Sequence, residues 1–242
     1  MRFQIPLLKK ESVANNTLLL RFQKPEGFGF KPGQFVQVSL PDSFDSDDRG
    51  NSRDISIASA PFEKELIFVV RLRDSSFKKG LEKLSIGKEI TIKNAQGPFL
   101  LHEDTHVPAV FIAGGIGVTP FRSMLLHNLY NKLPFKTILF YSSKNENDGI
   151  FLKELQRIEK ENHNHKNIIS FTSLEKNDIG LSERGRINRE MVTKYISDLG
   201  SPLFYLAGPL GMVKSMESML DTMGIQRERI VLDYFTGYEQ SV

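Results

Sequence analysis

The feature that most constrains the fold is a change of hydrophobic pattern near residue 105. Up to about residue 103, short alternating segments such as 17–22 and 34–40 are separated by turn residues, which is typical of antiparallel strands. From Pro108 onward, short apolar runs alternate with helical stretches, which indicates strand–helix units around a parallel sheet. We therefore expect two domains, 1–103 and 104–242.

The same pattern predicts the elements of each domain. In the first, further strands are expected at 53–58, 65–72 and 89–93, with one helix at 77–84, which together favour a small antiparallel barrel. The second domain is expected to have the following elements: strands at 109–113, 136–142, 167–172 and 203–207, and helices at 120–131, 151–161 and 210–223. The fold class predicted is therefore a two-domain α+β protein with a parallel α/β second domain.

Composition excludes several kinds of site. The chain has no cysteine, so disulfides, thiolate zinc sites and cysteine-ligated iron–sulfur clusters are excluded, and a partner with such a cluster would be another polypeptide. The net charge of +3 is too small to indicate nucleic-acid binding. The five histidines are scattered, and we interpret His163 and His165 as a solvated helix end. No metal site is expected.

No segment has the pattern of a signal peptide or a membrane span. Lys9 and Lys10 interrupt the N-terminal apolar run. The longest largely apolar stretch, 107–121, contains three glycines and is shorter than the ~20 residues that a spanning helix needs. We expect a cytoplasmic protein; the sequence does not indicate its oligomeric state.

An acidic insertion at 42–51 weakly resembles a calcium-binding loop. It contains Asp45, Asp47 and Asp48, but Ser56 occupies the position where a bidentate glutamate would be required. We interpret the insertion as a solvated surface loop.

Two glycine-rich segments have the pattern of phosphate-binding turns. The first, 111–120, reads FIAGGIGVTP, follows an apolar strand and opens a helix, where glycines let the backbone approach a pyrophosphate. The second, 206–212, reads LAGPLGM and also lies between a strand and a helix. Because the carboxyl ends of parallel strands share one edge of a sheet, the two turns are expected to hold parts of one extended nucleotide.

A third segment, 53–61, lies in the first domain and reads RDISIASAP. An arginine and hydroxyls on a strand suit a phosphate and a polar ring edge. From the residues alone, a cross-strand salt bridge with ordinary strand serines is the preferred interpretation.

The five segments R-D-I-S-I-A-S-A-P, G-P-F, A-G-G-I-G-V-T-P, A-G-P-L-G-M and D-Y-F-T-G-Y, in this order and spacing, resemble the ferredoxin-NADP reductase superfamily. The resemblance covers nearly the whole chain. It implies a Greek-key β-barrel that binds flavin, an α/β domain that binds NAD(P), and hydride transfer between NAD(P)H and the flavin, with FAD favoured over FMN.

The resemblance also implies roles for residues of the first domain. Arg53 would bind a flavin phosphate, and Ser56 would hydrogen-bond near flavin N5. Ile55 stands where the family has an aromatic residue that stacks on the flavin, a loss of ~1 kcal/mol. The remaining flavin-binding candidates here are Asp54, Arg71, Ser75, Ser76, Phe77 and Lys78. From the residues alone, Ser75 or Ser76 also suits an ordinary helix cap.

In the second domain the resemblance implies that the glycine-rich segments bind the nicotinamide nucleotide. The residues are Gly114, Gly115, Gly117, Thr119, Pro120, Gly208, Pro209 and Met212. Ala207 stands where many relatives carry cysteine, and Asp233 where glutamate is common. Asp233 and Phe235 are implied at the reaction centre, with Tyr238 as a second aromatic candidate. A terminal strand that simply packs its aromatic residues is an equally good interpretation.

The choice of nucleotide and acceptor is less constrained by the sequence. Ser142, Lys144 and Arg186 suit the 2′-phosphate of NADPH, which we favour slightly over NADH. The basic set Arg71, Arg73, Lys78, Lys79 and Lys83 suits an acidic electron-transfer protein such as a ferredoxin or flavodoxin, or serves only flavin phosphates and solubility. Two alternative functions stay open: an NAD(P)H:flavin reductase with exchangeable flavin, and a non-catalytic electron-transfer or nucleotide-sensing subunit of a larger complex.

Overall fold

The computed structural model describes residues 1–45, 47–48, 50–173 and 183–235. It divides into two compact units. The first consists of Met1–Leu100 together with Arg122–His127, and the second of Leu101–Phe121 and Asn128–Val242. The domain limits expected from the sequence, 1–103 and 104–242, stay a prediction.

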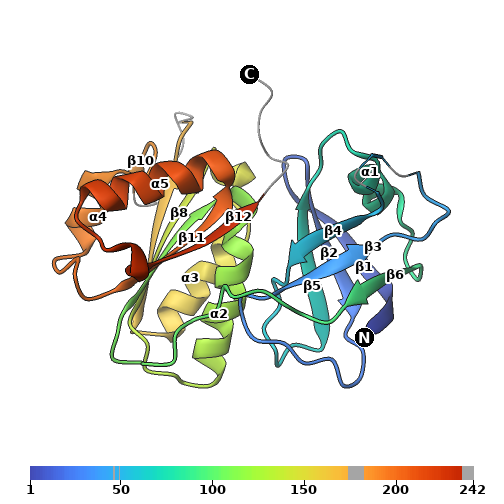
Figure 1. The fold of residues 1–242 in the computed structure, drawn as a ribbon, viewed down its shortest axis with the longest axis horizontal. Coiled ribbons are helices and arrows are strands. Elements are labelled where there is room, and N and C mark those ends of the chain that lie inside the picture. Colours follow the sequence, from blue (N-terminus) through green and yellow to red (C-terminus); the bar gives the residue numbers. More distant parts are fainter. Residues whose placement is uncertain (46, 49, 174–182, 236–242) are drawn as a thin grey trace. The chain divides into compact units, whose positions relative to one another are not determined.

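The first unit is built on a six-stranded antiparallel sheet in the order β4-β3-β6-β1-β2-β5 (Figure 1). Its strands are β1 (Arg2–Ala14), β2 (Thr17–Gln23), β3 (Phe35–Ser39), β4 (Ser52–Ser56), β5 (Glu65–Arg71) and β6 (Glu89–Lys93). The backbone N–H of Ala58, just after β4, donates to Ile67 O of β5 at 2.9 Å. This bond joins the two ends of the strand order, so the sheet closes on itself as a barrel does.

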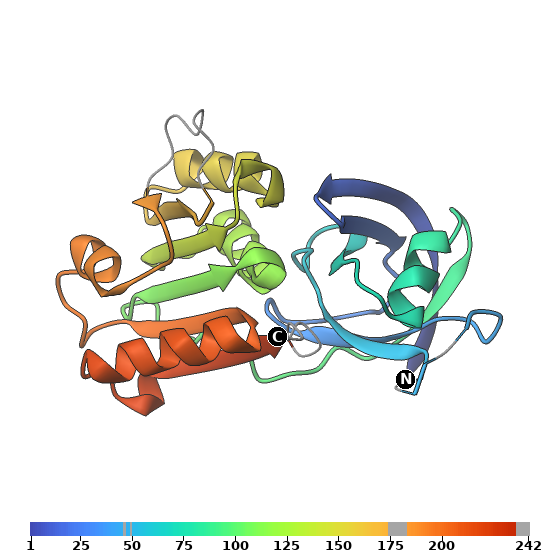
Figure 2. The ribbon, with the colours of Figure 1, turned by 90° about the horizontal axis from the view of Figure 1, so that it is seen from above.

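The single helix of this unit, α1 (Ser76–Lys83), completes its core. Phe77 and Leu81 are almost fully buried and belong to the same apolar cluster as Val36 and Ile57 of the sheet side. The Ser75 hydroxyl caps the helix by accepting from Lys78 N–H at 3.3 Å. The Ser75 cap therefore fixes the residue at which α1 begins. Figure 2 shows the helix against the strands of its own unit.

The second unit contains a six-stranded parallel sheet in the order β10-β9-β8-β7-β11-β12. Its strands are β7 (Ala109–Gly114), β8 (Thr137–Ser143), β9 (His165–Phe171), β10 (Glu183–Arg184), β11 (Leu203–Pro209) and β12 (Ile230–Phe235). From β7 the chain proceeds outward through β8, β9 and β10, then returns to place β11 on the other side of β7. The strand order thus reverses between the neighbouring strands β7 and β11. The carboxyl ends of two such strands form a topological switch point, where ligands of open α/β sheets bind.

Helices cover both faces of this sheet (Figure 1). They are α2 (Val118–Tyr130), α3 (Leu152–Glu161), α4 (Arg189–Tyr195) and α5 (Leu210–Thr222). Val110 and Ile112 of β7 face one side, in a cluster with residues of α4 and α5, while Phe111 faces the other and stacks on Phe121 with ring centres 4.7 Å apart. The strand alternation explains why β7 is apolar throughout: both of its faces are buried.

The predicted fold class is confirmed: an antiparallel sheet domain followed by a parallel α/β domain. The sequence pattern missed β1, because two register shifts, between Leu7 and Lys9 and between Ser12 and Ala14, break its alternation. It also missed α4 and β10, which have only seven and two residues.

Candidate functional site

Four neighbouring strands of the second unit end at one edge of its sheet. In the β-ladder, Gly114 of β7 pairs with Ser142 of β8. On the other side of β7, Ala113 pairs with Ala207 of β11, which in turn pairs with Asp233 of β12. Residues from four separate sequence segments therefore meet at this edge of the sheet.

The two glycine-rich turns pack backbone to backbone. A Cβ added at Gly117 would lie 2.1 Å from Ala207 O, which no side chain tolerates. Gly208 has a φ of +151°, and a Cβ there would lie 3.1 Å from Gly114 O. Both positions require glycine, because the turn after β7 and the turn after β11 contact each other directly. This packing leaves backbone, and not side chains, at the centre of the edge.

The start of α5, which follows the second of these turns, presents first-turn amides to the edge. Helix α5 begins after Pro209 and has no side-chain cap, so its first-turn N–H groups and its positive dipole end suit an anion. The Met212 sulfur lies beside Gly114, 3.2 Å from where a Cβ would be. At the start of α2, the Thr119 hydroxyl donates to Ile116 O at 2.9 Å and shapes the turn itself. Pro120, like Thr119, is buried.

Three polar side chains border the far side of this edge. Ser142 is half-buried at the end of β8, and Lys144 is exposed just beyond it. Arg186 is exposed two residues after β10. Backbone bonds tie the segments together: Ser173 N–H donates to Lys144 O, and Gly185 N–H to Phe171 O. Two cationic side chains thus follow β8 and β10 at the carboxyl edge.

The carboxyl of Asp233 is unusual among the acidic groups of the second unit. It is half-buried at the end of β12, and burial raises its pKa from 3.8 to about 6. Phe235 ends the same strand and is half-buried. Tyr238, the other aromatic candidate, lies outside the described residues.

In the first unit the candidate anion site centres on Arg53 of β4. Its Nη1 donates to the carbonyl oxygens of Gly50 at 2.8 Å and Ser52 at 2.7 Å. Its Nη2 donates to both carboxylate oxygens of Asp47, at 2.8 and 3.1 Å. The guanidinium carbon lies 5.4 Å from the ring centre of Phe77, the second residue of α1. Arg53 therefore lies next to the start of α1, and its guanidinium is ion-paired with Asp47.

The start of α1 adds backbone donors to this arginine. Helix amides of the first turn are not used within the helix, so Ser76 and Phe77 place N–H groups at its positive end. Ser75, Ser76, Lys78 and Arg71 are each half-buried. A guanidinium beside a helix N-terminus has the chemistry of a phosphate site. The salt bridge of Arg53 with Asp47 is made to the insertion, and not across two strands as the residues alone led us to expect.

The other β4 candidates alternate across the sheet. Ile55 is 9% exposed and belongs to the apolar core of the unit, so little of its side chain is left for a flavin ring. Asp54 is exposed and Ser56 is half-buried. Ser56 pairs with Phe35 in the ladder.

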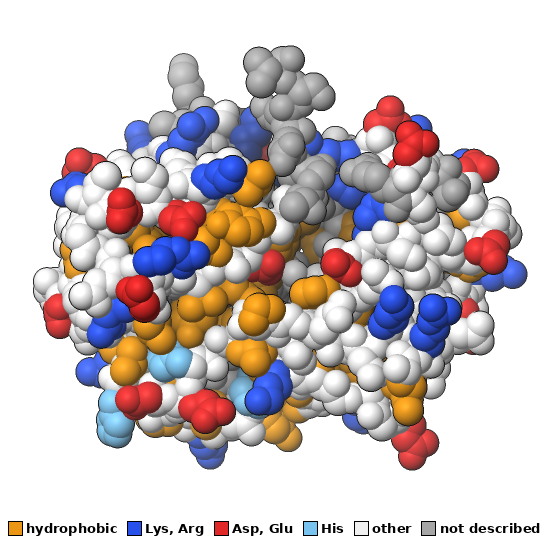
Figure 3. Space-filling view, viewed as in Figure 1, with side chains coloured by type: hydrophobic (Ala, Val, Ile, Leu, Met, Phe, Trp, Pro, Cys, Tyr) orange, Lys and Arg blue, Asp and Glu red, His pale blue; other side chains and the backbone are white. Residues whose placement is uncertain are grey.

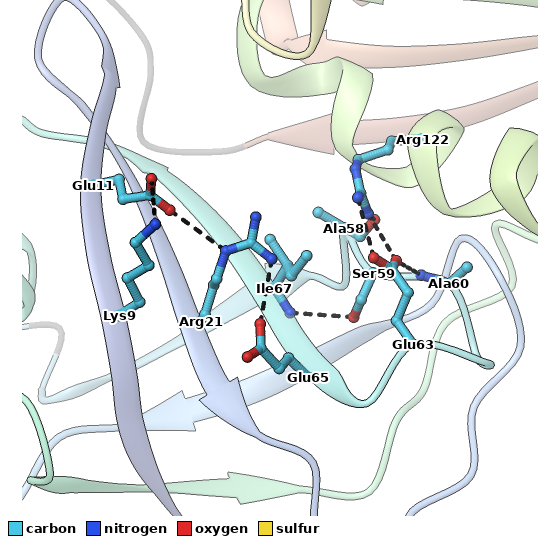
Figure 4. Close-up of polar contacts among 10 residues, drawn as sticks. All are labelled: Lys9, Glu11, Arg21, Ala58, Ser59, Ala60, Glu63, Glu65, Ile67 and Arg122. Atoms are coloured by element: carbon cyan, nitrogen blue, oxygen red, sulfur yellow. Dashed lines mark hydrogen bonds and ion pairs between the residues drawn. The ribbon is translucent and has the colours of Figure 1, made fainter. Parts of the chain in front are cut away.

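The sequence motifs missed the residues that hold the segment following β4 (Figure 4). Arg122, only 5% exposed, donates to Ala58 O at 2.7 Å and pairs with Glu63 at 2.9 Å. The same Glu63 carboxylate accepts from Ala60 N–H at 2.6 Å, and Ser123 donates to Ser59 O at 2.7 Å. The sequence signal was Arg122, a single charge within the apolar stretch PFRSMLL. A charged side chain in such a stretch is buried only when it has an ion-pair partner.

A cavity of about 390 Å³ lies at the opposite edge of the second unit's sheet, where β7, β8 and β9 begin. It is not part of the site described above. Our interpretation of His163 and His165 as a solvated helix end is wrong for His165, which is buried at the start of β9. Its ring nitrogens contact the Thr137 hydroxyl at 2.8 Å and Asn167 Oδ1 at 2.9 Å. Burial lowers its pKa, so a neutral, structural imidazole follows.

Within the described ranges, no cluster of His, Asp or Glu is arranged to hold a metal ion, and no helix is long and apolar enough to cross a bilayer. Acidic and basic side chains are interspersed over the described part of the face in Figure 3. That face presents no continuous basic stripe of the kind that tracks a nucleic-acid backbone.

Comparison with known proteins agrees with this geometry. The oxidoreductase NAD-binding domain model matches residues 111–218. The chain is 26% identical to a component of the Na(+)-translocating NADH-quinone reductase of Idiomarina loihiensis, over 89% of this chain and 63% of that protein. It is also 26% identical to the propane 2-monooxygenase reductase component of Rhodococcus jostii, over 88% and 58%. The chain thus spans about three fifths of these relatives.

Solved structures share the two-domain fold. A ferredoxin NADP⁺ reductase from Neisseria gonorrhoeae, with bound FAD and NADP, superimposes with a TM-score of 0.81 at 20% identity, covering 96% of this chain and 98% of that one. The FAD/NAD-binding domain of a Vibrio cholerae nitric oxide dioxygenase gives 0.80 at 17% identity, covering 96% and 98%. These structures show the fold of the chain, and residues 111–218 match an oxidoreductase NAD-binding domain.

The donor sets of both units suit phosphate groups. The edge of the second unit has backbone amides and glycines that suit a pyrophosphate, and Arg53 with the start of α1 has a cation and amides that suit a phosphate. Two positions depart from the sequence pattern of ferredoxin-NADP reductases without obstructing either region. Ile55 supplies no aromatic ring, and Ala207, buried within β11, supplies no thiol.

Proposed function

We propose that this chain is a flavoenzyme that takes electrons from NAD(P)H onto a bound flavin and passes them to a further acceptor. The observation that carries the proposal is the packing of Gly117 against Ala207 O at the switch point. That contact places two backbone turns and the uncapped start of α5 at one sheet edge, which is the arrangement that binds a dinucleotide.

In the proposed nucleotide site, backbone groups bind the part shared by NADH and NADPH. Gly114, Gly115 and Gly117, with Gly208 and Pro209, would contact the pyrophosphate and the nicotinamide end, and Met212 would contact the nicotinamide. Ser142, Lys144 and Arg186 would bind the 2′-phosphate of NADPH. The positions of the two cations after β8 and β10 favour NADPH over NADH.

In the proposed flavin site, Arg53 and the first turn of α1 would hold the phosphates, and FAD is favoured over FMN. Asp54, Ile55, Arg71 and the segment Ser75–Lys78 are the other candidate contacts. The flavin supplies the chemistry: it accepts two electrons together and releases them singly or in pairs. The protein positions the reactants, excludes water and neutralises phosphate charge.

Ser56, Asp233 and Phe235 are the candidates for the reaction centre. Ser56 would donate a hydrogen bond to flavin N5. Asp233, with its pKa near 6, would change charge close to neutral pH. Phe235 would cover the flavin ring. No strong general acid or base is needed, because proximity and orientation account for most of the rate.

The acceptor is proposed to be an acidic electron-transfer protein such as a ferredoxin or flavodoxin. Its docking surface would be the basic set around α1: Arg71, Arg73, Lys78, Lys79 and Lys83. Lys79 is ion-paired with Asp74 at 2.5 Å, which reduces the charge of this set. Because residues 1–242 contain no cysteine, they hold no thiolate-bound cluster, and the electrons would leave the flavin for an acceptor outside these residues.

Mixing the purified protein anaerobically with NADPH or NADH tests the proposal. We expect flavin absorption on purification or after adding FAD, and its rapid bleaching by NADPH in preference to NADH. A protein that binds no flavin, or whose bound flavin is not bleached by either nucleotide, contradicts the proposal and favours a non-catalytic, nucleotide-sensing subunit.

The alternative of an exchangeable-flavin reductase is favoured by one observation, the buried position of Ile55. Without an aromatic residue stacked on the ring, the flavin loses ~1 kcal/mol of contact. Colourless protein that reduces added flavin with NAD(P)H, and loses it again on gel filtration, would establish this alternative.

A further inference from the structure

The acidic insertion that the sequence predicts as a plain surface loop contacts Arg53. The Asp47 side chain is 25% exposed and that of Arg53 is 21% exposed, and Arg53 Nη2 contacts both carboxylate oxygens of Asp47. A tight turn positions the acid: Gly50 N–H donates to Asp47 O at 2.7 Å, and Gly50 has a φ of +70°. This backbone hydrogen bond thus helps to position the Asp47 carboxylate next to the Arg53 guanidinium.

Two nitrogens of the guanidinium already have partners in this structure. Nη1 donates to the Gly50 and Ser52 carbonyls, and Nη2 donates to both carboxylate oxygens of Asp47. A phosphate that binds this guanidinium through Nη2 must therefore take the place of the Asp47 carboxylate, and a second anion beside Asp47 is also repelled by its charge.

We infer that Asp47 is a built-in competitor for the flavin phosphate on Arg53, and that it weakens and so controls flavin retention in this protein. The inference rests on the proposed function. It adds that the ligand of this site is recognised by its phosphate, and that displacement of Asp47 is part of binding. Flavins with and without a phosphate are therefore distinguished by the state of this one carboxylate.

The test measures dissociation constants of apoprotein for FAD, FMN and riboflavin by quenching of flavin fluorescence. Asp47→Asn keeps the size of the side chain and removes its charge. We expect it to tighten FAD and FMN binding by about tenfold or more, equivalent to ~1.4 kcal/mol, and to leave riboflavin binding within twofold, because riboflavin has no phosphate.

Asp48→Asn is the matched control. It removes the same charge from the same insertion, at an exposed neighbouring position, so it reports the general electrostatic effect, which salt screens. We expect a change of less than twofold for all three flavins. Asp47→Ser repeats the charge removal with a smaller polar side chain, and thermal unfolding of each variant verifies that the barrel is intact.

The outcomes separate the inference from the function. If the wild type binds FAD and both Asp47 variants are folded but bind FAD no more tightly, the inference is wrong and the proposed function stands. Equal tightening for riboflavin and FAD also contradicts it, since the effect would not act through the phosphate. If wild type and both variants bind none of the three flavins, the proposed function fails and the inference fails with it.

Discussion

The two proposed anion-binding regions differ in what would supply their donors. At the carboxyl edge of the second unit, the turns after β7 and β11 contact each other through Gly117 and Gly208, and backbone amides would make the site. In the first unit, the guanidinium of Arg53 would be the centre, and the carboxylate of Asp47 contacts it. A backbone site has donors of fixed position, whereas a side-chain site depends on which partner its charge finds.

This difference predicts different responses to substitution. In the backbone site, one added methyl group should be destructive, because the atoms it meets are main chain and cannot move aside. In the side-chain site, affinity should change with charge and be restored by a compensating change. The predictions below test this contrast.

The largest effect is expected for Gly117→Ala. Its Cβ would lie 2.1 Å from Ala207 O and 2.7 Å from Gly208 Cα, so the two turns must separate at a cost of about 3 kcal/mol in the free energy of unfolding. We expect urea unfolding at lower concentration and loss of NADPH binding measured by nucleotide fluorescence.

The matched control for this substitution is Gly211→Ala. No atom lies within 4 Å of a Cβ at Gly211, which is in the first turn of α5, so the change is expected to be neutral or slightly stabilising. Equal losses for both variants would show that the contact between the turns is not what makes glycine necessary at position 117.

A somewhat smaller effect, about 2 to 3 kcal/mol, is expected for Arg122→Met. The change leaves the Glu63 carboxylate, 21% exposed, without its buried partner. Arg157→Met provides the control, because Arg157 is 52% exposed and its pair with Glu161 should contribute less than ~0.5 kcal/mol. Unfolding free energies measure both.

Because the Arg122 pair is made of side chains, its loss should be recoverable. The double variant Arg122→Met with Glu63→Met removes both charges and should regain part of the lost stability. If it is no more stable than Arg122→Met alone, the pair is not the source of the effect, and the hydrogen bond from Arg122 to Ala58 O becomes the better explanation.

The third prediction concerns the pH dependence of stability at Asp233. Its folded-state pKa is about 6 against an ordinary 3.8, so between those values the folded state binds more protons than the unfolded state. Stability from this group therefore falls as pH rises through this window, by on the order of 2 kcal/mol between pH 4 and pH 8.

Asp233→Asn removes the titration and should be more stable than the wild type at pH 8, with the difference shrinking towards pH 4. Urea unfolding of both proteins across this range isolates the contribution, since every other titrating group is common to them. Parallel stability curves would contradict the desolvation of this carboxyl.

The sequence predicted backbone contacts better than contacts between side chains. The glycines at 117 and 208 were informative in the sequence, because little besides glycine fits where the two turns meet backbone to backbone. The Asp47–Arg53 contact was not predicted, since the insertion gave no pattern that decides which acid reaches the arginine. Arg122 was missed for a related reason: its partner Glu63 is 59 residues away in sequence, and a single charge in an apolar stretch does not name its partner.

The smallest effect is expected for the side chains of the second unit that we propose to bind the 2′-phosphate of NADPH. Backbone donors cannot distinguish NADPH from NADH away from the pyrophosphate, so any preference must come from Ser142, Lys144 and Arg186. Lys144 and Arg186 are exposed, and each contact with a 2′-phosphate is expected to contribute ~1 kcal/mol. Lys144→Ala or Arg186→Ala should therefore raise the KM for NADPH about fivefold and leave that for NADH unchanged.

Lys153→Ala, on α3, is the control for loss of one positive charge. If both nucleotides weaken equally, the cations serve general attraction, and the selectivity of this edge would have to come from its backbone after all.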